Sequence, residues 1–251
     1  MTGALRGIGR ACALALARSG FNILLNDLPV HDASVLSQQL AGEIDTSGAE
    51  STFFGCDVGE LDQHRPLIDA ACSRWGRVDC LVNNAGVGVV KRGDLLDVTS
   101  ESFDRCIRVN TKAVFFLSQA VARHMLKQGD LGGRHRSIIN ITSSNAVAVS
   151  ISRAEYCVSK CASSMTTRLF AVRLAAEGIG VYEVRPGIVD TDMTRPVKDQ
   201  YDALIKESVP AGRWGFPADV AMTVRSMAEG RLTYTVGQAV TVDGGLTIPR
   251  F

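Results

Sequence analysis

The 251-residue sequence contains no hydrophobic run long enough to cross a bilayer. Its apolar stretches, such as 11–17 and 113–117, span only a few residues. No secretory signal is visible, because Arg6 and Arg10 interrupt the first segment and no apolar core follows. An excess of charge is also lacking, since 27 Lys and Arg balance 26 Asp and Glu for a net charge of +1. We therefore expect a cytoplasmic protein with no nucleic-acid or membrane partner.

The seven cysteines form no metal or disulfide pattern. Their number is odd, and no two have the spacing Cys-x-x-Cys. Cys157 and Cys161 would share one face of a helix, but no histidine or further cysteine lies nearby to complete a metal site. We therefore expect no bound metal, and buried thiols in a reducing compartment.

Short apolar runs alternate with longer helical patterns along the whole chain. Candidate strands lie at 22–26, 51–55, 78–83, 137–141, 181–184 and 238–242. Candidate helices lie at 7–19, 33–47, 60–75, 101–128, 153–177 and 217–229. Continuous runs of Val, Ile and Leu are typical of parallel strands that are covered on both faces. The alternation predicts an α/β fold in a single domain spanning 1–251: a doubly wound parallel sheet with helices on both faces.

Two irregular stretches, 85–99 and 186–216, each follow a candidate strand. Irregular segments of this length in a compact domain are usually functional, and ligands of open α/β sheets bind beyond the carboxyl ends of the strands. We therefore expect a mostly apolar substrate pocket bordered by these stretches. The residues expected to line it include Val89, Ala146, Val147, Val149, Ile151, Ile188 and Met193.

The chain opens on a glycine-rich motif, Thr-Gly-Ala-Leu-Arg-Gly-Ile-Gly at 2–9, directly before a candidate helix. Glycines let the backbone approach a pyrophosphate closely, and the amides and dipole of a helix N-terminus favour its charge. Asp27 ends the next strand, eighteen residues after Gly9, near the spacing at which an acid binds a ribose hydroxyl. The pattern predicts a dinucleotide site; the alternative is an ordinary turn followed by a surface acid.

A strand should precede this glycine motif, yet only Met1 stands before Thr2. In a doubly wound sheet the first strand is central, so its loss would expose the edges of two neighbours. We therefore expect a truncated first strand, with about five to eight residues missing through truncation or a mis-set start.

Tyr156 and Lys160 lie four residues apart on a candidate helix and so share one face. A free tyrosine has a pKa near 10 and is a poor base at neutral pH. An ammonium within about 5 Å lowers that pKa, which would let the phenol pass a proton to or from a substrate oxygen. Ser143, thirteen residues upstream, follows a candidate strand and could hold that oxygen. Taken alone, such a pair is more often a tyrosine and a lysine at the surface.

Together these motifs resemble the short-chain dehydrogenase/reductase family over essentially the whole chain from Thr2 onward. The matching segments are 2–9, Asp57-Val58, Asn83-Asn84-Ala85-Gly86, Val-Asn-Thr at 109–111, Ile-Thr-Ser at 141–143, Tyr156 with Lys160, Arg-Pro-Gly at 185–187, Thr191-Asp192-Met193, 213–220 and 242–245. Their order and spacing are specific for the family and say little about the substrate. Within the family, the chain is similar to 3-oxoacyl-[acyl-carrier-protein] reductases.

The resemblance implies a Rossmann-type, NAD(P)-dependent oxidoreductase that interconverts a ketone and a secondary alcohol. It implies that Tyr156 donates or accepts the proton and that Lys160 lowers its pKa and binds the nicotinamide ribose. Ser143 would orient the substrate oxygen, with Ser144 as the neighbouring alternative, and Asn110 would support a water that links Lys160 to solvent. The residues implied in cofactor binding are Gly3, Arg6, Gly7, Ile8, Gly9, Asp27, Asp57, Val58, Asn84, Ala85, Gly86, Tyr156, Lys160, Pro186, Gly187 and Thr191.

Two residues disagree about the cofactor. Asp27 should bind the adenosine ribose hydroxyls and repel a 2′-phosphate, which favours NAD(H). Arg6 stands where NADP-using relatives place a cation for that phosphate, so NADP(H) stays open. A carboxylate and a phosphate in one pocket repel each other, and for this reason we weigh Asp27 more heavily.

The resemblance implies a small carbonyl compound or alcohol as substrate, and a 3-oxoacyl thioester on an acyl carrier protein is one candidate. Arg134, Arg136 and Arg153 could bind such an acidic partner, although Glu177 opposes it. Sugars, polyols and other alcohols are the alternative. The resemblance also implies a homotetramer or homodimer that pairs through helices 101–128 and 153–177. Phe115 and Phe116, on the first of these helices, fit such an interface, and they fit a buried core equally well.

Two rival functions use the same fold. A non-catalytic NAD(P)-binding regulator typically lacks the tyrosine or the lysine, and this chain has both. An isomerase or epimerase that uses NAD transiently tends to carry a larger C-terminal substrate domain, whereas only about seventy residues follow the catalytic helix here.

Overall fold

Parallel strands form two sheets in the computed structural model, which describes residues 1–128 and 132–250, with the backbone alone at Gln200. The first sheet pairs β1 (Ile23–Asp27) with β2 (Ser51–Gly55). The second has the order β3 (Cys80–Asn83), β4 (Arg136–Ile141), β5 (Ile179–Pro186) and β6 (Ala239–Val242). Strand ends differ from the predicted ones by at most two residues. The parallel pairing confirms the predicted α/β class.

Met1 and Thr2 lie between the two sheets and hydrogen-bond to both. The Thr2 amide donates to the Val82 carbonyl of β3 (3.1 Å), and the Asn26 amide of β1 donates to the Met1 carbonyl (3.0 Å). The sheets are therefore joined at the carboxyl ends of these strands, where the loops meet. A cavity of about 570 Å³ lies along the rest of the gap between β1 and β3.

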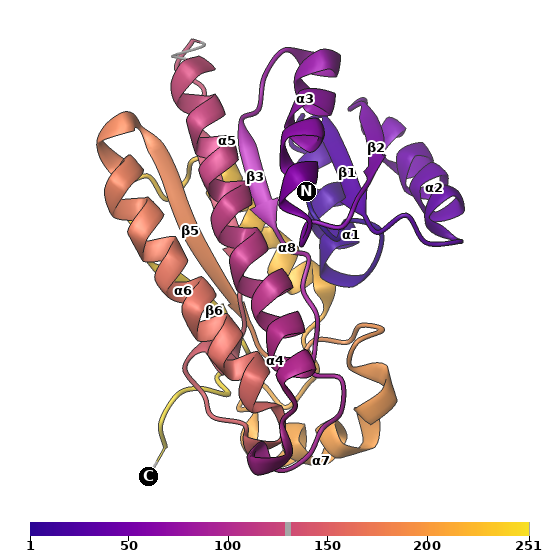
Figure 1. Ribbon diagram of the computed structural model, residues 1–251, viewed down its shortest axis with the longest axis vertical. Coiled ribbons are helices and arrows are strands. Elements are labelled where there is room, and N and C mark those ends of the chain that lie inside the picture. Colours follow the sequence, from indigo (N-terminus) through magenta and orange to yellow (C-terminus); the bar gives the residue numbers. More distant parts are fainter. Residues whose placement is uncertain (129–131, 251) are drawn as a thin grey trace.

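Helices cover both faces of the sheets (Figure 1). On one face, α1 (Gly7–Ala17) and α8 (Pro217–Ala228) pack against each other, with α2 (Ala33–Asp45) beside them. On the other face lie α3 (His64–Trp75), α5 (Val114–Gln128) and α6 (Ala154–Leu174). Single 3₁₀ turns occur at Leu61–Gln63, Leu95–Asp97, Ser144–Ala146, Ile151–Arg153, Ala175–Glu177 and Arg195–Val197. None of the helices in 1–128 and 132–250 is both long and apolar enough to cross a membrane.

Two predicted segments differ from the structure. The single helix expected over 101–128 is divided into α4 (Ser100–Ile107), a π-helical turn (Arg108–Ala113) and α5. Such wide turns often occur at functional sites, and this one contains Asn110. The irregular stretch 186–216 contains a helix, α7 (Lys198–Ser208), whose buried Tyr201 and Ile205 have helical spacing. The flanking prolines and glycines concealed that spacing in the sequence.

Candidate active site

A cavity of about 1550 Å³ lies at the carboxyl ends of the strands, where ligands of open α/β sheets bind. Most of the predicted site residues line it. They are Gly3, Arg6, Gly7, Ile8, Gly9, Asp27, Asn84, Ala85, Gly86, Ser143, Tyr156, Lys160, Pro186, Gly187 and Thr191. The structure thus brings together residues that are far apart in the sequence, as the motifs predicted.

The glycine motif forms a backbone cradle at one end of the cavity. A Cβ atom added at Gly9 would lie 1.9 Å from the Gly3 carbonyl oxygen, so no larger residue fits there. Gly3 and Gly7 have φ angles of +58° and +51°, which favour glycine. Helix α1 follows at once, and no side chain in the described residues caps its N-terminus. Its first amides are therefore available for an anion, and the cradle fits the pyrophosphate of a dinucleotide.

Asn84 ties this cradle to the end of β3. Its side-chain amide donates to the carbonyl oxygens of Thr2 (3.0 Å) and Gly3 (2.8 Å). The backbone amides of Asn84 and Ala85 both donate to the Thr2 hydroxyl at 3.0 Å. These bonds hold the glycine motif and the loop after β3 at a fixed separation across the cavity.

Asp27 and Arg6 both line the cavity at the end formed by the glycine cradle. The Asp27 carboxylate accepts hydrogen bonds from the amides of Leu5 (3.0 Å) and Leu28 (2.9 Å). Arg6 forms an ion pair with Asp32, which directly precedes α2. Asp32 was not predicted from the sequence, because its distance from the glycine motif follows no known spacing. The Asp32 carboxylate thus neutralises Arg6, the cation that the sequence had suggested for a 2′-phosphate.

Lys160 is 4% exposed and lies in the second turn of α6. Its ammonium donates to the Ile141 carbonyl oxygen at the end of β4 (3.1 Å) and lies 5.7 Å from the centroid of the Tyr156 ring. Burial lowers the pKa of Lys160 to about 8, and the charges of Cys106 and Glu183 oppose this shift.

Tyr156 lies in the first turn of α6, and burial raises the pKa of its phenol. A hydrogen bond with Ser143 and the positive charge of Arg153 oppose this shift. The lowering of the Tyr156 pKa that the sequence predicted from Lys160 is not found, because the ammonium is directed to the Ile141 carbonyl and desolvation dominates. The phenol is therefore protonated at neutral pH and can donate its proton.

Ser143 follows the last residues of β4 and begins the turn Ser144–Ala146. Its hydroxyl accepts a hydrogen bond from the Asn145 amide (3.1 Å) and also interacts with the Tyr156 phenol. Ser144 lines the same cavity, but of the two serines it is Ser143 that hydrogen-bonds to the Tyr156 phenol. The role of Ser143 in holding the substrate oxygen stays a prediction.

Asn110 is fully buried in the π-helical turn and does not line the cavity. Its side chain accepts from the Val87 amide (2.8 Å) and donates to the Val87 carbonyl (2.9 Å) and to the Ser159 hydroxyl (3.0 Å). Gly86 separates it from Lys160: a Cβ at Gly86 would lie 3.2 Å from the Asn110 oxygen and 3.3 Å from the Lys160 nitrogen. Asn110 thus braces the loop that carries Gly86.

Asp57 and Val58 also lie outside the cavity wall. Asp57 forms an ion pair with Arg108 (2.9 Å) and accepts from the Gly59 amide (2.8 Å). Val58 is buried in the apolar cluster beneath α3 and α5. Their role in cofactor binding stays a prediction.

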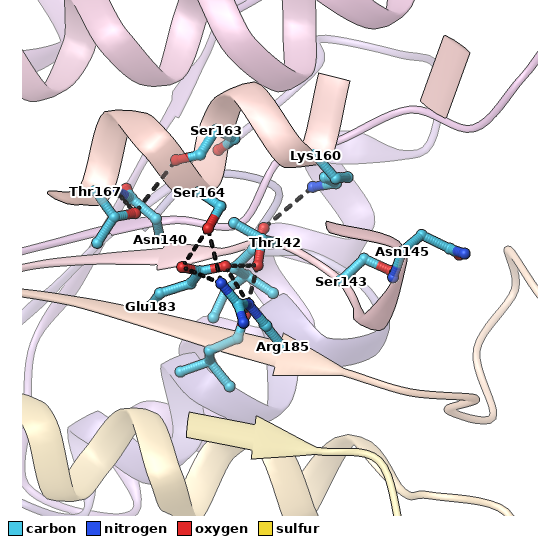
Figure 2. A network of polar contacts seen from close by, with 12 residues as sticks. Asn140, Thr142, Ser143, Asn145, Lys160, Ser163, Ser164, Thr167, Glu183 and Arg185 are labelled. Atoms are coloured by element: carbon cyan, nitrogen blue, oxygen red, sulfur yellow. Dashed lines mark hydrogen bonds and ion pairs between the residues drawn. The ribbon is translucent and has the colours of Figure 1, made fainter. Parts of the chain in front are cut away.

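A buried polar network lies beneath the site and was not predicted (Figure 2). Glu183 on β5 is fully buried, and its carboxylate accepts from Thr142 (2.6 Å), Ser164 (2.8 Å) and Arg185 (2.7 Å). Because Thr142 lies between Ile141 and Ser143, the network fixes the end of β4 against α6. The sequence did contain a sign of this network: Glu183 and Arg185 lie two residues apart in an otherwise apolar strand, so their side chains point to the same face.

The wall of the cavity is mostly apolar, as predicted, although some of the predicted residues do not line it. Val89, Val149, Ile188 and Met193 line it as expected, whereas Ala146, Val147 and Ile151 do not. Four arginines also line it, namely Arg92, Arg105, Arg153 and Arg250.

Comparisons with known proteins agree with this geometry. A family described as Enoyl-(Acyl carrier protein) reductase matches residues 3–247. The chain is 35% identical over 246 residues to the 3-oxoacyl-[acyl-carrier-protein] reductase FabG of Staphylococcus epidermidis, covering 98% of this chain and 97% of the relative. The crystal structure of 3-oxoacyl-[acyl-carrier protein] reductase from Brucella melitensis in complex with NAD is 39% identical, with a TM-score of 0.94 and coverage of 100% and 96%. A putative 2-deoxy-d-gluconate 3-dehydrogenase from Agrobacterium tumefaciens with bound NADP is 29% identical, with a TM-score of 0.85 and coverage of 99% and 95%.

Proposed function

Because the chain belongs to the short-chain dehydrogenase/reductase family, we propose that Tyr156, Lys160 and Ser143 catalyse the interconversion of a ketone and a secondary alcohol. The observation that carries the proposal is their convergence on one cavity with the glycine cradle. A nicotinamide cofactor, when bound, supplies or accepts the hydride.

Each catalytic side chain has a separate task. Tyr156 donates its phenolic proton to the ketone oxygen during reduction and takes it back during oxidation. Ser143, which interacts with that phenol, holds the same oxygen. Lys160 anchors the end of β4 through the Ile141 carbonyl and presents its charge to the cofactor ribose. Asn110 keeps the Gly86 loop in place behind Lys160.

NAD(H) is the preferred cofactor in this proposal. Asp27 would accept hydrogen bonds from the adenosine ribose hydroxyls and would repel a 2′-phosphate. Arg6, the cation that could attract that phosphate, is already paired with Asp32. Two carboxylates near one phosphate are unfavourable, so we expect a higher kcat/KM with NADH than with NADPH. Among the similar structures, one binds NAD and one binds NADP.

Two substrate classes are supported by the relatives. Reductases of 3-oxoacyl-[acyl-carrier-protein] suggest a 3-oxoacyl thioester, with acyl carrier protein as a partner. The gluconate-type dehydrogenase suggests a sugar or polyol derivative. Of the arginines proposed for a carrier protein, Arg136 donates to the carbonyls of Met125 (2.9 Å) and Glu177 (2.7 Å), whereas Arg153 faces the cavity.

We also propose that the chain assembles through α5 and α6, which lie side by side on one face (Figure 1). Large apolar side chains on these helices remain exposed, including Phe116 (38%), Leu169 (56%) and Val172 (79%). Such a surface supports symmetric pairing into a homodimer or homotetramer.

A panel of ketones and alcohols, assayed with NADH, NADPH and their oxidised forms, tests the proposed function. Net consumption or formation of reduced nicotinamide supports a dehydrogenase. Tight NADH binding without turnover of any compound would instead favour the non-catalytic regulator, and conversion of a substrate without net nicotinamide change would favour an isomerase or epimerase.

A further inference from the structure

The cavity is positively charged on its substrate side. Apart from Lys160, the charged residues that line it beyond the glycine cradle are Arg92, Arg105, Arg153, Arg250 and one acid, Asp192. Asp192 is already paired with Arg195 at 2.8 Å. The other acid in the wall, Asp27, lies at the adenosine end. The part of the wall that would meet a substrate therefore carries an excess of cations.

The four arginines differ from most others in the protein. Twelve arginines form ion pairs with Asp or Glu. None of these four does so within the described residues. They donate instead to neutral groups: the Tyr201 hydroxyl, the Gly88 carbonyl, the Ser150 hydroxyl and the Ser208 carbonyl, respectively. Their charge is thus left for a ligand.

Arg153 lies closest to the chemistry. It directly precedes α6, three residues before Tyr156, and its guanidinium carbon lies 5.8 Å from the centroid of the Tyr156 ring. Its charge also opposes the rise in the pKa of that phenol. An anionic group bound to Arg153 would therefore lie only a few bonds from the ketone that Tyr156 protonates.

Arg92 is held in a fixed position on the loop after β3. One of its N–H groups donates to the Tyr201 hydroxyl (2.9 Å), and its guanidinium lies 5.3 Å from the centroid of the same ring. Tyr201 in turn packs edge-on against Trp214, which donates to Asp202 (2.6 Å). A guanidinium has five N–H groups, so Arg92 keeps donors for a ligand while its orientation is fixed.

From this arrangement we propose that the substrate is an oxo acid, or the corresponding hydroxy acid, whose carboxylate binds Arg153 and Arg92. The inference rests on the proposed dehydrogenase function and specifies its substrate class. In reduction, the ketone carbon would accept a hydride from NADH, which becomes NAD⁺, as the C=O π-bond breaks. Tyr156 would give its proton to the oxygen, and its phenolate would then regain a proton from solvent. The carboxylate takes no part in this redox change; it fixes the position of the ketone.

An acyl carrier thioester fits these arginines less well. Its carbonyl groups are neutral, and its phosphate lies at the far end of the long pantetheine arm. Arg153, beside Tyr156, would then face a neutral part of the substrate and remain an unpaired cation. A carboxylate matches a guanidinium in charge and in planar, two-point geometry.

Matched pairs of substrates test the inference. Short oxo acids, plain and polyhydroxylated, are each compared with their methyl esters and with a neutral acetoacetyl thioester, using NADH. A hydrogen bond to a charged group contributes about 1.5–3 kcal/mol, which corresponds to about 10-fold to 100-fold in affinity. We therefore expect kcat/KM for an acid to exceed that for its ester by about tenfold or more, mainly through KM.

Variants of the arginines separate recognition from general damage. Arg153→Gln and Arg92→Gln should each lower the ratio of kcat/KM for acid over ester by about tenfold. Arg18→Gln is the matched control, because Arg18 is exposed at the end of α1 and does not line the cavity. It should leave the ratio unchanged.

Several outcomes would overturn the inference. Equal kcat/KM for acids and esters would do so, as would an equal loss for both in the Arg153 and Arg92 variants. Turnover of the thioester, with no turnover of any free acid, would also reject the oxo acid while leaving the dehydrogenase function intact. Absence of turnover for every compound, with NADH and NADPH alike, would instead reject the proposed function itself.

Discussion

Replacing Lys160 with methionine should remove activity and yet stabilise the cofactor-free protein. Lys160 is 4% exposed, and burial lowers its pKa from 10.5 to about 8. One pKa unit corresponds to about 1.4 kcal/mol, so the native state holds this charge at a penalty of about 3 kcal/mol at pH 7. Methionine removes the penalty and also the hydrogen bond to the Ile141 carbonyl, which contributes about 1.5–3 kcal/mol. The expected net gain in the free energy of unfolding is about 1 kcal/mol.

The same shift determines how this gain depends on pH. Unfolded lysine keeps its proton up to about pH 10.5, whereas native Lys160 releases it near pH 8. The unfolded state therefore binds more protons between these values, and the penalty is full below pH 8 and declines as the pH rises toward 10.5. Buried thiols such as Cys12, whose pKa is raised to about 12, lower stability over the same range in both proteins. The difference between wild type and variant isolates Lys160.

Urea unfolding followed by circular dichroism, at fixed protein concentration and at pH 7, 8, 9 and 10, measures this difference. The advantage of Lys160→Met should be largest at pH 7, should disappear near about pH 9, and should be reversed at about pH 10. Lys91→Met is the control, since Lys91 is exposed and its removal should leave the pH dependence as in wild type. A variant less stable than wild type at pH 7, or an advantage of equal size at pH 7 and pH 10, would refute the reasoning.

Three further predictions follow from the same structure. Glu183→Leu leaves the largely buried Arg185 without its carboxylate partner, and it should lower the free energy of unfolding in urea by about 3–5 kcal/mol. Adding Arg185→Leu should restore much of this loss, and losses that simply add would contradict the prediction. Gly9→Ala places a methyl group against the Gly3 carbonyl and should weaken NADH binding by about tenfold or more in a fluorescence titration, in contrast to Gly42→Ala, which has open space. Asp27→Ser removes the carboxylate from the ribose end and should raise kcat/KM for NADPH relative to NADH by about tenfold, and an unchanged ratio would show that Asp27 does not select the cofactor.

The sequence was most informative where one local pattern specifies the structure. Continuous runs of Val, Ile and Leu predicted the parallel strands, because buried strands need apolar residues on both faces. The glycine motif predicted the cradle, since Gly9 touches the Gly3 carbonyl and tolerates no side chain. Tyr156 and Lys160 were predicted to share a helix face, and they do. The predicted family is confirmed by relatives that cover nearly the whole chain.

Features that depend on long-range contacts were not predictable. The division of the expected helix 101–128 depends on Asn110, whose partners Val87 and Ser159 come from a different loop and a different helix. The raised pKa of Tyr156 depends on desolvation in the folded protein, which no spacing reveals. The charge of the substrate pocket arises because arginines from separate segments, 92 and 153 among them, meet only in the fold.

The proposed function depends most on Tyr156 as the proton donor of a site that binds the cofactor without needing its hydroxyl. The direct test compares Tyr156→Phe with wild type in two measurements: kcat for the best substrate of the panel, and the Kd for NADH from fluorescence titration. Positioned general acids contribute about 10²- to 10⁴-fold, so the account predicts a loss of that size in kcat with NADH binding changed by no more than about twofold. A variant that retained most of its kcat would contradict the central claim.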